Sequence, residues 1–296
     1  MIEELKLPEG TLSDFRKMKG WLEEKTKLES GLCFERQSVV WEHGESGAHT
    51  LLLFRLNPVA VIVKSLGDER CHMIPLGKTE PKKIIDTVCE NGLIRENEDN
   101  NKELLLDAFE KPTVGDVYHL SPDFGCKGEK LYGCQAGVLA QIQLAAACIK
   151  ALAESQQRVT VAIVNETVAG VEGVLGILDR VRPDTLVVSS SAATGKELLL
   201  GKGPAIGIKD GNWLADRTLW GAMMDLVTDT QTYIGNTGNT LERCYLAAKT
   251  KQVAAIYLPV VGMGTRVDEI NKNDLEKTQN LVLKCVESFD TKNSNQ

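Results

Sequence analysis

The second half of the chain alternates short apolar runs with longer stretches whose apolar residues recur at helical spacing. The runs predict strands at 159–164, 185–188, 205–208, 232–234 and 253–259. The longer stretches predict helices at 168–181, 214–228, 241–249 and 274–288, the last capped by Asn273. Strands that alternate with helices form parallel sheets covered on both faces. We therefore predict an α/β fold with a mixed, largely parallel sheet and helices on both faces.

The first part of the chain contributes further elements to this sheet. Thr11, followed three residues later by Asp14, resembles a capping box and predicts a helix over 11–28. Apolar, β-branched segments predict strands at 39–41 and 51–63, with the glycine-containing segment 43–47 as a hairpin loop. The segment 136–153 is rich in Ala, Leu and Ile and predicts a long buried helix.

Between these regions the character of the sequence changes. Segments such as 95–102 and 111–116 are polar, and they stand in place of the long stretches with regularly spaced apolar residues found on either side. We predict that residues 1–63 and 131–296 form one α/β domain, interrupted by a small β-rich inserted domain at 64–130.

Composition and charge narrow the classes of function. The chain has 34 Lys plus Arg against 41 Asp plus Glu among 296 residues, a net charge of −7. Phosphate backbones and anionic membranes would repel it, so neither nucleic acid nor membrane is an expected partner. The start of the chain is acidic and no apolar stretch reaches bilayer length, so we expect a cytoplasmic protein. Its eight cysteines form no C-x-x-C pair, which argues against a disulfide framework and a zinc knuckle.

Several short motifs, taken in order, resemble the glutamyl aminopeptidases, also called tetrahedral aminopeptidases. They are Asn165-Glu166-Thr167-Val168, the run 182–188, the run 201–206, Gln231 with 238–240, and Ile256-Tyr257-Leu258-Pro259. The resemblance covers most of the chain and implies the zinc-peptidase-like fold. It also implies a relationship to enzymes that bind two zinc or cobalt ions through His and carboxylate ligands, with a separate Glu as general base.

At the positions matching the family's metal ligands, the sequence departs from the family pattern. Leu56-Asn57-Pro58 stands where the family has His-x-Asp, and 133–137 stands where it has its bridging Asp. The five positions that replace the ligands are Leu56, Gly133, Thr167, Ser189 and Gly264. Only the position of the general base is retained, as Glu166, and no metal or other cofactor is expected.

Each candidate residue also has an ordinary structural interpretation. Glu166 stands where a strand meets a helix, and an acidic residue there commonly stabilises the first turn. Cys134 precedes the long helix, whose dipole could activate it as a nucleophile, or it is a small buried replacement for Asp. A new metal site built from the four histidines with Cys71 and Cys126 is a further alternative, although Cys71 and His72 point to opposite sides of a strand.

The leading hypothesis is a non-catalytic homologue of the metallo-aminopeptidases that keeps a groove for a peptide ligand and forms homo-oligomers. The alternative is an active hydrolase, either a metallo-aminopeptidase or a metal-independent enzyme that uses Glu166 and Cys134. A third hypothesis is a structural oligomer without a ligand.

Overall fold

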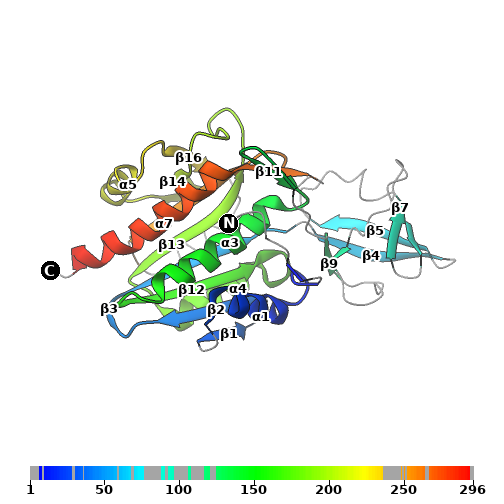
Figure 1. Ribbon diagram of the computed structural model, residues 1–296, viewed down its shortest axis with the longest axis horizontal. Helices are drawn as coiled ribbons and strands as arrows, with labels where there is room; N and C mark the ends of the chain where they lie inside the picture. The colour runs from blue at the N-terminus through cyan, green and yellow to red at the C-terminus, as the bar shows by residue number, and fades with distance from the viewer. Residues whose placement is uncertain are drawn as a thin grey trace.

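The computed structural model describes residues 7–8, 10–28, 31–35, 37–58, 60–67, 70–76, 88–90, 93–96, 106–107, 117–120, 125–235, 248, 250, 252–263 and 267–293, some by backbone alone. Within these ranges the main body is a large sheet with helices packed on it, and the small sheets formed by strands within residues 60–120 extend from one end (Figure 1). None of the described helices is long and apolar enough to cross a membrane.

The main sheet has nine strands among the described residues, and most of its central pairs are parallel. Their order is β1-β2-β12-β3-β13-β17-β14-β15, with β16 beside β14. The bounds are β1 Leu32–Glu35, β2 Ser38–His43, β3 Ser46–Leu56, β12 Gln157–Asn165, β13 Thr185–Ala193, β14 Ala205–Asp210, β15 Trp213–Leu214, β16 Gln231–Gly235 and β17 Gln252–Val260. The pairs β12–β3, β3–β13 and β13–β17 are parallel, which confirms the predicted mixed, largely parallel sheet.

The expected hairpin at 43–47 is wrong. β12 lies between β2 and β3, so the two strands flank it and do not pair with each other. The reason is that the nine-residue run of β12, which is almost wholly buried, needs a partner on each edge. A short loop between two apolar runs therefore gave a false hairpin signal.

Helices cover both faces of the sheet, because side chains alternate between the faces along each strand. Leu52, Phe54 and Leu56 face a core shared with four helices, α1 (Phe15–Thr26), α3 (Ala136–Leu152), α5 (Arg217–Met224) and α7 (Lys272–Asn293). Leu51 and Leu53 face a second core against α4 (Glu166–Val181). Most residues of α3 are buried, which explains why its sequence is largely apolar.

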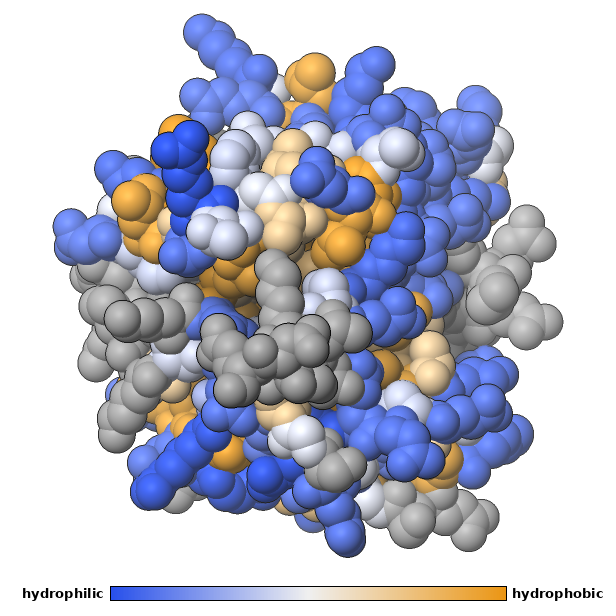
Figure 2. All heavy atoms as spheres, turned by 90° about the vertical axis from the view of Figure 1, so that its left-hand side faces the viewer, coloured by the Kyte–Doolittle hydropathy of each residue, from blue (hydrophilic) through white to orange (hydrophobic). Residues whose placement is uncertain are grey.

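At the end of the molecule where α5 lies, the surface is mainly hydrophilic, with hydrophobic residues gathered in its upper half (Figure 2). Trp220 and Met224 of α5 pack only in part against the core. α5 is also shorter than the helix predicted over 214–228, because Asp216 accepts bonds from the amides of Thr218 and Leu219 and thereby fixes its start.

Two other helix starts differ from their predictions for the same physical reason. Asp14 accepts from the amide of Arg16 and is the cap of α1, so the helix begins at Phe15 and not at Thr11. Asn271, and not Asn273, caps α7, accepting from the amides of Asn273 and Asp274 at 2.8 and 3.3 Å. The helix predicted over 241–249 lies outside the described residues apart from position 248.

The described part of the predicted insert is made of strands. β4 (Ala60–Gly67), β5 (Arg70–Leu76), β8 (Leu106–Asp107) and β9 (Val117–Leu120) form one antiparallel sheet. β6 (Val88–Glu90) pairs with β7 (Leu93–Glu96). The single strand predicted over 51–63 is two strands, and pairing assigns residues 60–63 to the small sheet. The division of the chain into domains stays a prediction.

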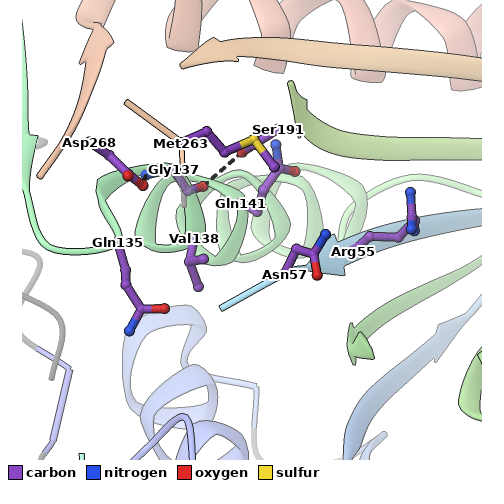
Figure 3. Close-up of a pocket in the computed structure, with 9 residues that line it drawn as sticks. All are labelled: Arg55, Asn57, Gln135, Gly137, Val138, Gln141, Ser191, Met263 and Asp268. Atoms are coloured by element: carbon purple, nitrogen blue, oxygen red, sulfur yellow. Dashed lines mark hydrogen bonds between the residues drawn. The ribbon is translucent and has the colours of Figure 1, made fainter. Parts of the chain in front are cut away.

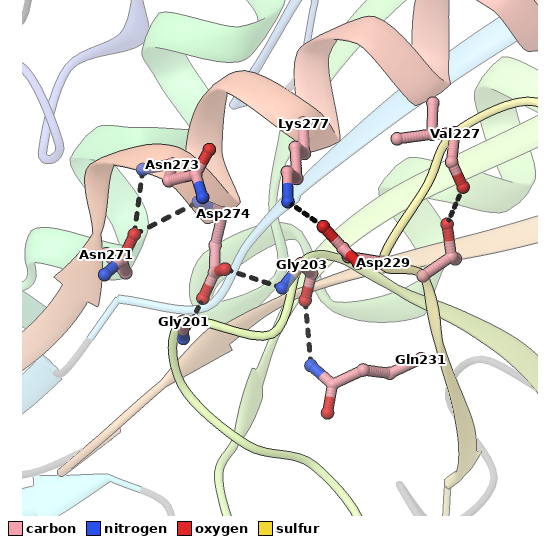
Figure 4. A network of polar contacts seen from close by, with 10 residues as sticks. Gly201, Gly203, Val227, Asp229, Gln231, Asn271, Asn273, Asp274 and Lys277 are labelled. Atoms are coloured by element: carbon pink, nitrogen blue, oxygen red, sulfur yellow. Dashed lines mark hydrogen bonds and ion pairs between the residues drawn. The ribbon is translucent and has the colours of Figure 1, made fainter.

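A hydrogen-bonded clamp fixes the loop that follows β13 against the start of α7 (Figure 4). The carboxylate of Asp274 accepts from the backbone amides of Gly201 and Gly203, both at 2.7 Å. The side chain of Gln231 donates to the carbonyls of Gly203 and Leu199, at 2.8 and 2.9 Å, and accepts from the amide of Leu199 at 2.9 Å. These contacts engage both carboxylate oxygens of Asp274 and both polar atoms of the Gln231 amide.

Candidate functional site

A small pocket lies where the carboxyl ends of parallel strands meet the start of α3 (Figure 3). This edge of an open α/β sheet is where ligands bind, because the loops there diverge. The pocket encloses about 20 Å³, which is space for one or two water-sized groups. Its lining comprises Arg55, Asn57, Gln135, Gly137, Val138, Gln141, Ser191, Met263 and Asp268.

A buried ion pair joins β3 to the start of α4 beside this pocket. The parallel register places Val164 opposite Arg55 and Asn165 opposite Leu56, so Glu166 follows directly beyond the strand end. Arg55 donates from Nε and Nη2 to the two oxygens of Glu166, and each side chain is only 5% exposed. Such a bidentate pair holds both groups in a fixed geometry.

Adjacent to the pair, the first turns of α3 are held by polar contacts from other elements. Gln135, in left-handed conformation at φ 61°, is the N-cap but makes no side-chain capping bond. Asp268 of β18 (Asp268–Asn271) supplies the missing acceptor, since its Oδ2 accepts from the amide of Gly137 at 3.3 Å. Ser191 donates to the carbonyl of Gly137 at 3.1 Å.

Glycine suits position 137 because the helix approaches the sheet closely there and a larger residue would crowd two side chains of the sheet. A Cβ atom at Gly137 would lie 3.0 Å from Val260 Cγ2 and 3.2 Å from Ser191 Oγ. Ser189 donates to Gln141 Oε1 at 2.8 Å, which ties the second turn of α3 to β13. The pocket wall is therefore built from one helix packed tightly on the strand ends.

Two buried polar atoms of the lining have no partner within the protein. They are Oδ1 of Asp268 and Nε2 of Gln141, whose residues are 5% and 0% exposed. Burial raises the pKa of Asp268 to about 7, although the amide of Gly137 opposes the shift. The carboxyl of Asp268 therefore changes charge near neutral pH.

Among the residues predicted to replace metal ligands, the described ones do not belong to the lining of this pocket. Leu56 is fully buried in the core, while its neighbours Arg55 and Asn57 line the pocket. Gly133, at the end of β11 (Lys130–Gly133), pairs with Asp268. Ser189 lies beside Phe54 and bonds Gln141. Thr167 lies in the first turn of α4, and Gly264 lies outside the described residues. Their convergence on one cleft stays a prediction.

Glu166, the predicted position of the general base, is the first residue of α4, as expected for an acidic residue at a strand–helix junction. Cys134 is half-buried and lies two residues before α3. The neighbouring Asn165 contacts His119 of β9, with 3.0 Å between Asn165 Nδ2 and His119 Nε2. Burial lowers the pKa of His119 to about 4, so this histidine is neutral.

The described residues do not fit the two-cation site that the fold family implies. Among them no three His, Cys, Asp or Glu side chains are close enough together to hold a metal ion. The pocket is lined by a guanidinium and three carboxamides, with Asp268 as its single carboxyl group. Divalent cations need anionic oxygen or neutral nitrogen ligands, and Glu166 is already bound by Arg55.

Most of the residues that line the pocket could not be recognised from the sequence. Arg55 carried a usable signal, because it is a charged residue at the end of the apolar run 51–54. In a parallel sheet that position lies beside the end of the next strand, where Glu166 stands. No comparable pattern indicated Gln141 or Asp268, because each has other polar residues beside it in its own helix or strand and nothing in the sequence sets it apart.

Several solved structures of aminopeptidases are similar to this chain in fold. The TET1 peptidase of Pyrococcus horikoshii, which can assemble into a tetrahedron or a large octahedral shell, superposes with a TM-score of 0.71 at 16% identity, over 90% of this chain and 92% of that one. A TET aminopeptidase from a marine-sediment Thaumarchaeota archaeon gives 0.73 at 16% identity over 97% of each chain. An aminopeptidase from the archaeon Desulfurococcus kamchatkensis gives 0.73 at 14% identity, over 96% of this chain and 92% of that one.

No family model matches the sequence, and no curated protein matches it either. At these low identities the structural likeness establishes the fold and not the chemistry. The predicted resemblance is confirmed at that level: the chain has the fold of the tetrahedral aminopeptidases.

Proposed function

We propose that this protein is a non-catalytic homologue of the metallo-aminopeptidases that retains a binding groove for peptides. The observation that carries the proposal is the buried ion pair between Arg55 and Glu166. A general base must be within reach of the water or substrate whose proton it removes. Glu166 instead has both oxygens bound by a group that is permanently protonated.

The composition of the pocket supports the same proposal. A two-metal hydrolase needs a cage of anionic ligands to replace the hydration shells of its ions. Here carboxamides line the pocket and the nearby cation is a guanidinium. Arg55 therefore provides the positive charge that balances Glu166, and no metal is needed for that purpose.

The peptide-binding part of the proposal rests on the scaffold. Binding grooves are shaped by strand ends and loops, which can persist after ligand residues change. The TET1 peptidase of Pyrococcus horikoshii can assemble into a tetrahedron or a large octahedral shell, and we propose that this chain also forms a homo-oligomer. Light scattering on the purified full chain would measure its molar mass directly.

An activity assay tests the loss of catalysis. The purified chain is incubated with a panel of aminoacyl-nitroanilides in the presence of zinc or cobalt, beside a Glu166→Gln variant. We expect the same background rate for both proteins with every substrate and metal. Turnover by the wild type that the variant loses would show an active aminopeptidase and overturn the proposal.

A further inference from the structure

The pocket beside α3 is lined by several side chains that can donate hydrogen bonds. Besides the guanidinium of Arg55, its lining holds the side-chain amides of Asn57, Gln135 and Gln141. The start of α3 adds the positive end of a helix dipole. A lining of this kind suits a ligand that accepts hydrogen bonds.

The two unpartnered atoms strengthen this conclusion, because they come from separate elements and line one pocket. Gln141 Nε2 on α3 is a donor without an acceptor, and Asp268 Oδ1 on β18 is an oxygen without a partner. Buried polar atoms are nearly always hydrogen-bonded, so these two atoms are the groups that a small ligand in the pocket would satisfy. The pocket volume of about 20 Å³ limits that ligand to a small polar group.

We propose that this pocket binds a carboxylate group, held between the side chains of Gln141 and Asp268 at the start of α3. Gln141 Nε2 donates to one oxygen of the bound carboxylate. The carboxyl group of Asp268, when it carries its proton, donates from Oδ1 to the other oxygen, while its Oδ2 keeps the bond from Gly137. A hydrogen bond from a carboxylic acid to a carboxylate is short and among the stronger ones in proteins.

The proposal implies that binding depends on pH. Asp268 faces Gly137 of α3, lies opposite Gly133 of β11, and shares the pocket with Ser191 of β13 and Arg55 of β3. Among the described lining residues only Asp268 and Arg55 are ionisable, and the charge of Arg55 is matched by Glu166. Because burial raises the pKa of Asp268 to about 7, a carboxylate should bind below that pH and be repelled above it.

Calorimetric titration of the full-length chain with small probes tests the proposal. Acetate and N-acetylglycine are the carboxylates, N-acetylglycinamide is the uncharged match of the second, and methylammonium carries the opposite charge. We expect saturable binding of acetate that is about tenfold tighter at pH 6 than at pH 8, and no binding of the amide or the amine. N-acetylglycine tells whether the pocket admits a carboxylate attached to a larger molecule.

Variants separate the roles of the two side chains. Gln141→Leu should weaken acetate binding about tenfold, whereas Gln157→Leu, which removes the same amide from the far end of β12, should leave it unchanged. Asp268→Asn keeps a donor at every pH, so it should bind acetate equally at pH 6 and pH 8. Circular dichroism on each variant confirms that it is folded.

The inference rests on the proposed loss of the metal site, and the two can fail separately. Binding of methylammonium, equal binding of N-acetylglycine and its amide, or no saturable acetate binding would overturn the carboxylate site alone. Stabilisation of the protein by stoichiometric zinc would overturn the proposed function.

Discussion

Two buried aspartates on one short stretch of chain have opposite surroundings. Asp274 at the start of α7 accepts two backbone bonds of 2.7 Å, from Gly201 and Gly203. Asp268, six residues earlier, accepts one bond of 3.3 Å from Gly137 and has an oxygen without a partner. Burial raises the pKa of both, and the backbone bonds oppose the shift in each case.

The difference separates structural from candidate functional roles. A carboxylate whose bonds are all made inside the protein holds a loop in place, as Asp274 does. A buried carboxyl group that lacks such bonds costs free energy, and such groups concentrate at binding and catalytic sites. Glu166 belongs with Asp274 in this comparison, because its partner Arg55 occupies both its oxygens.

The largest effect is expected from breaking the Arg55–Glu166 pair. Arg55→Met leaves Glu166 buried without a counter-charge and should lower the free energy of unfolding by about 3–5 kcal/mol. Arg55→Met combined with Glu166→Met should recover most of that loss. Thermal and urea unfolding measure both.

The exposed pair Arg180–Glu42 is the matched control for that experiment, with the two side chains 40% and 60% exposed. Arg180→Met should change the free energy of unfolding by less than about 1 kcal/mol. Equal losses in Arg55→Met and Arg180→Met would contradict the central role given to the buried pair.

The next effect concerns Asp268 and has a definite pH dependence. Its carboxyl has a pKa near 7 in the folded protein against 3.8 ordinarily, so the folded state holds the proton more tightly. Its contribution to stability is therefore greatest below pH 3.8 and is lost as the pH rises towards 7. Asp268→Asn should stabilise the protein at pH 8 by about 2–4 kcal/mol and have little effect at pH 4.

Unfolding of the wild type and Asp268→Asn across this pH range measures the difference. A wild type and variant whose stabilities stay parallel from pH 4 to pH 8 would show that Asp268 does not titrate in the folded state as described.

The same substitution at Asp274 should act in the opposite direction. Asp274→Asn replaces one acceptor oxygen with an NH₂ group facing a backbone amide, so one of the two 2.7 Å bonds is lost. We expect a loss of about 1–3 kcal/mol in the free energy of unfolding at pH 8. If Asp268→Asn and Asp274→Asn both stabilised the protein, the proposed difference between the two aspartates would be wrong.

The α/β fold could be predicted because its strands are long, apolar and regularly alternated with helices. β12, β17 and α3 lie close to their predicted bounds, whereas β13 starts as predicted and extends beyond its predicted end at 188 to Ala193. The pairing order could not be predicted locally, since the insertion of β12 between β2 and β3 joins segments more than a hundred residues apart. Helix starts were misplaced where the capping side chain was one of several neighbouring polar residues.

The candidate site was only partly predictable. The resemblance pointed to Leu56 and Glu166 as site positions, but it did not indicate that Arg55 binds this glutamate. A shift of one residue along a strand turns each side chain to the other face of the sheet. Matching short motifs near loops does not determine the position to within one residue. Asp268 and Gln141 are recognised only by the partners that they lack, and that property appears only in three dimensions.

Metal-dependent stability tests the central claim most directly. Ligands that bind only the folded state raise its stability by RT ln(1 + [L]/Kd), on the order of 4 kcal/mol at a thousandfold excess over Kd. With Glu166 paired to Arg55 and carboxamides lining the pocket, we predict that zinc, cobalt and a chelator all leave the melting temperature unchanged. A clear rise with stoichiometric zinc that the Glu166→Gln variant loses would contradict the account.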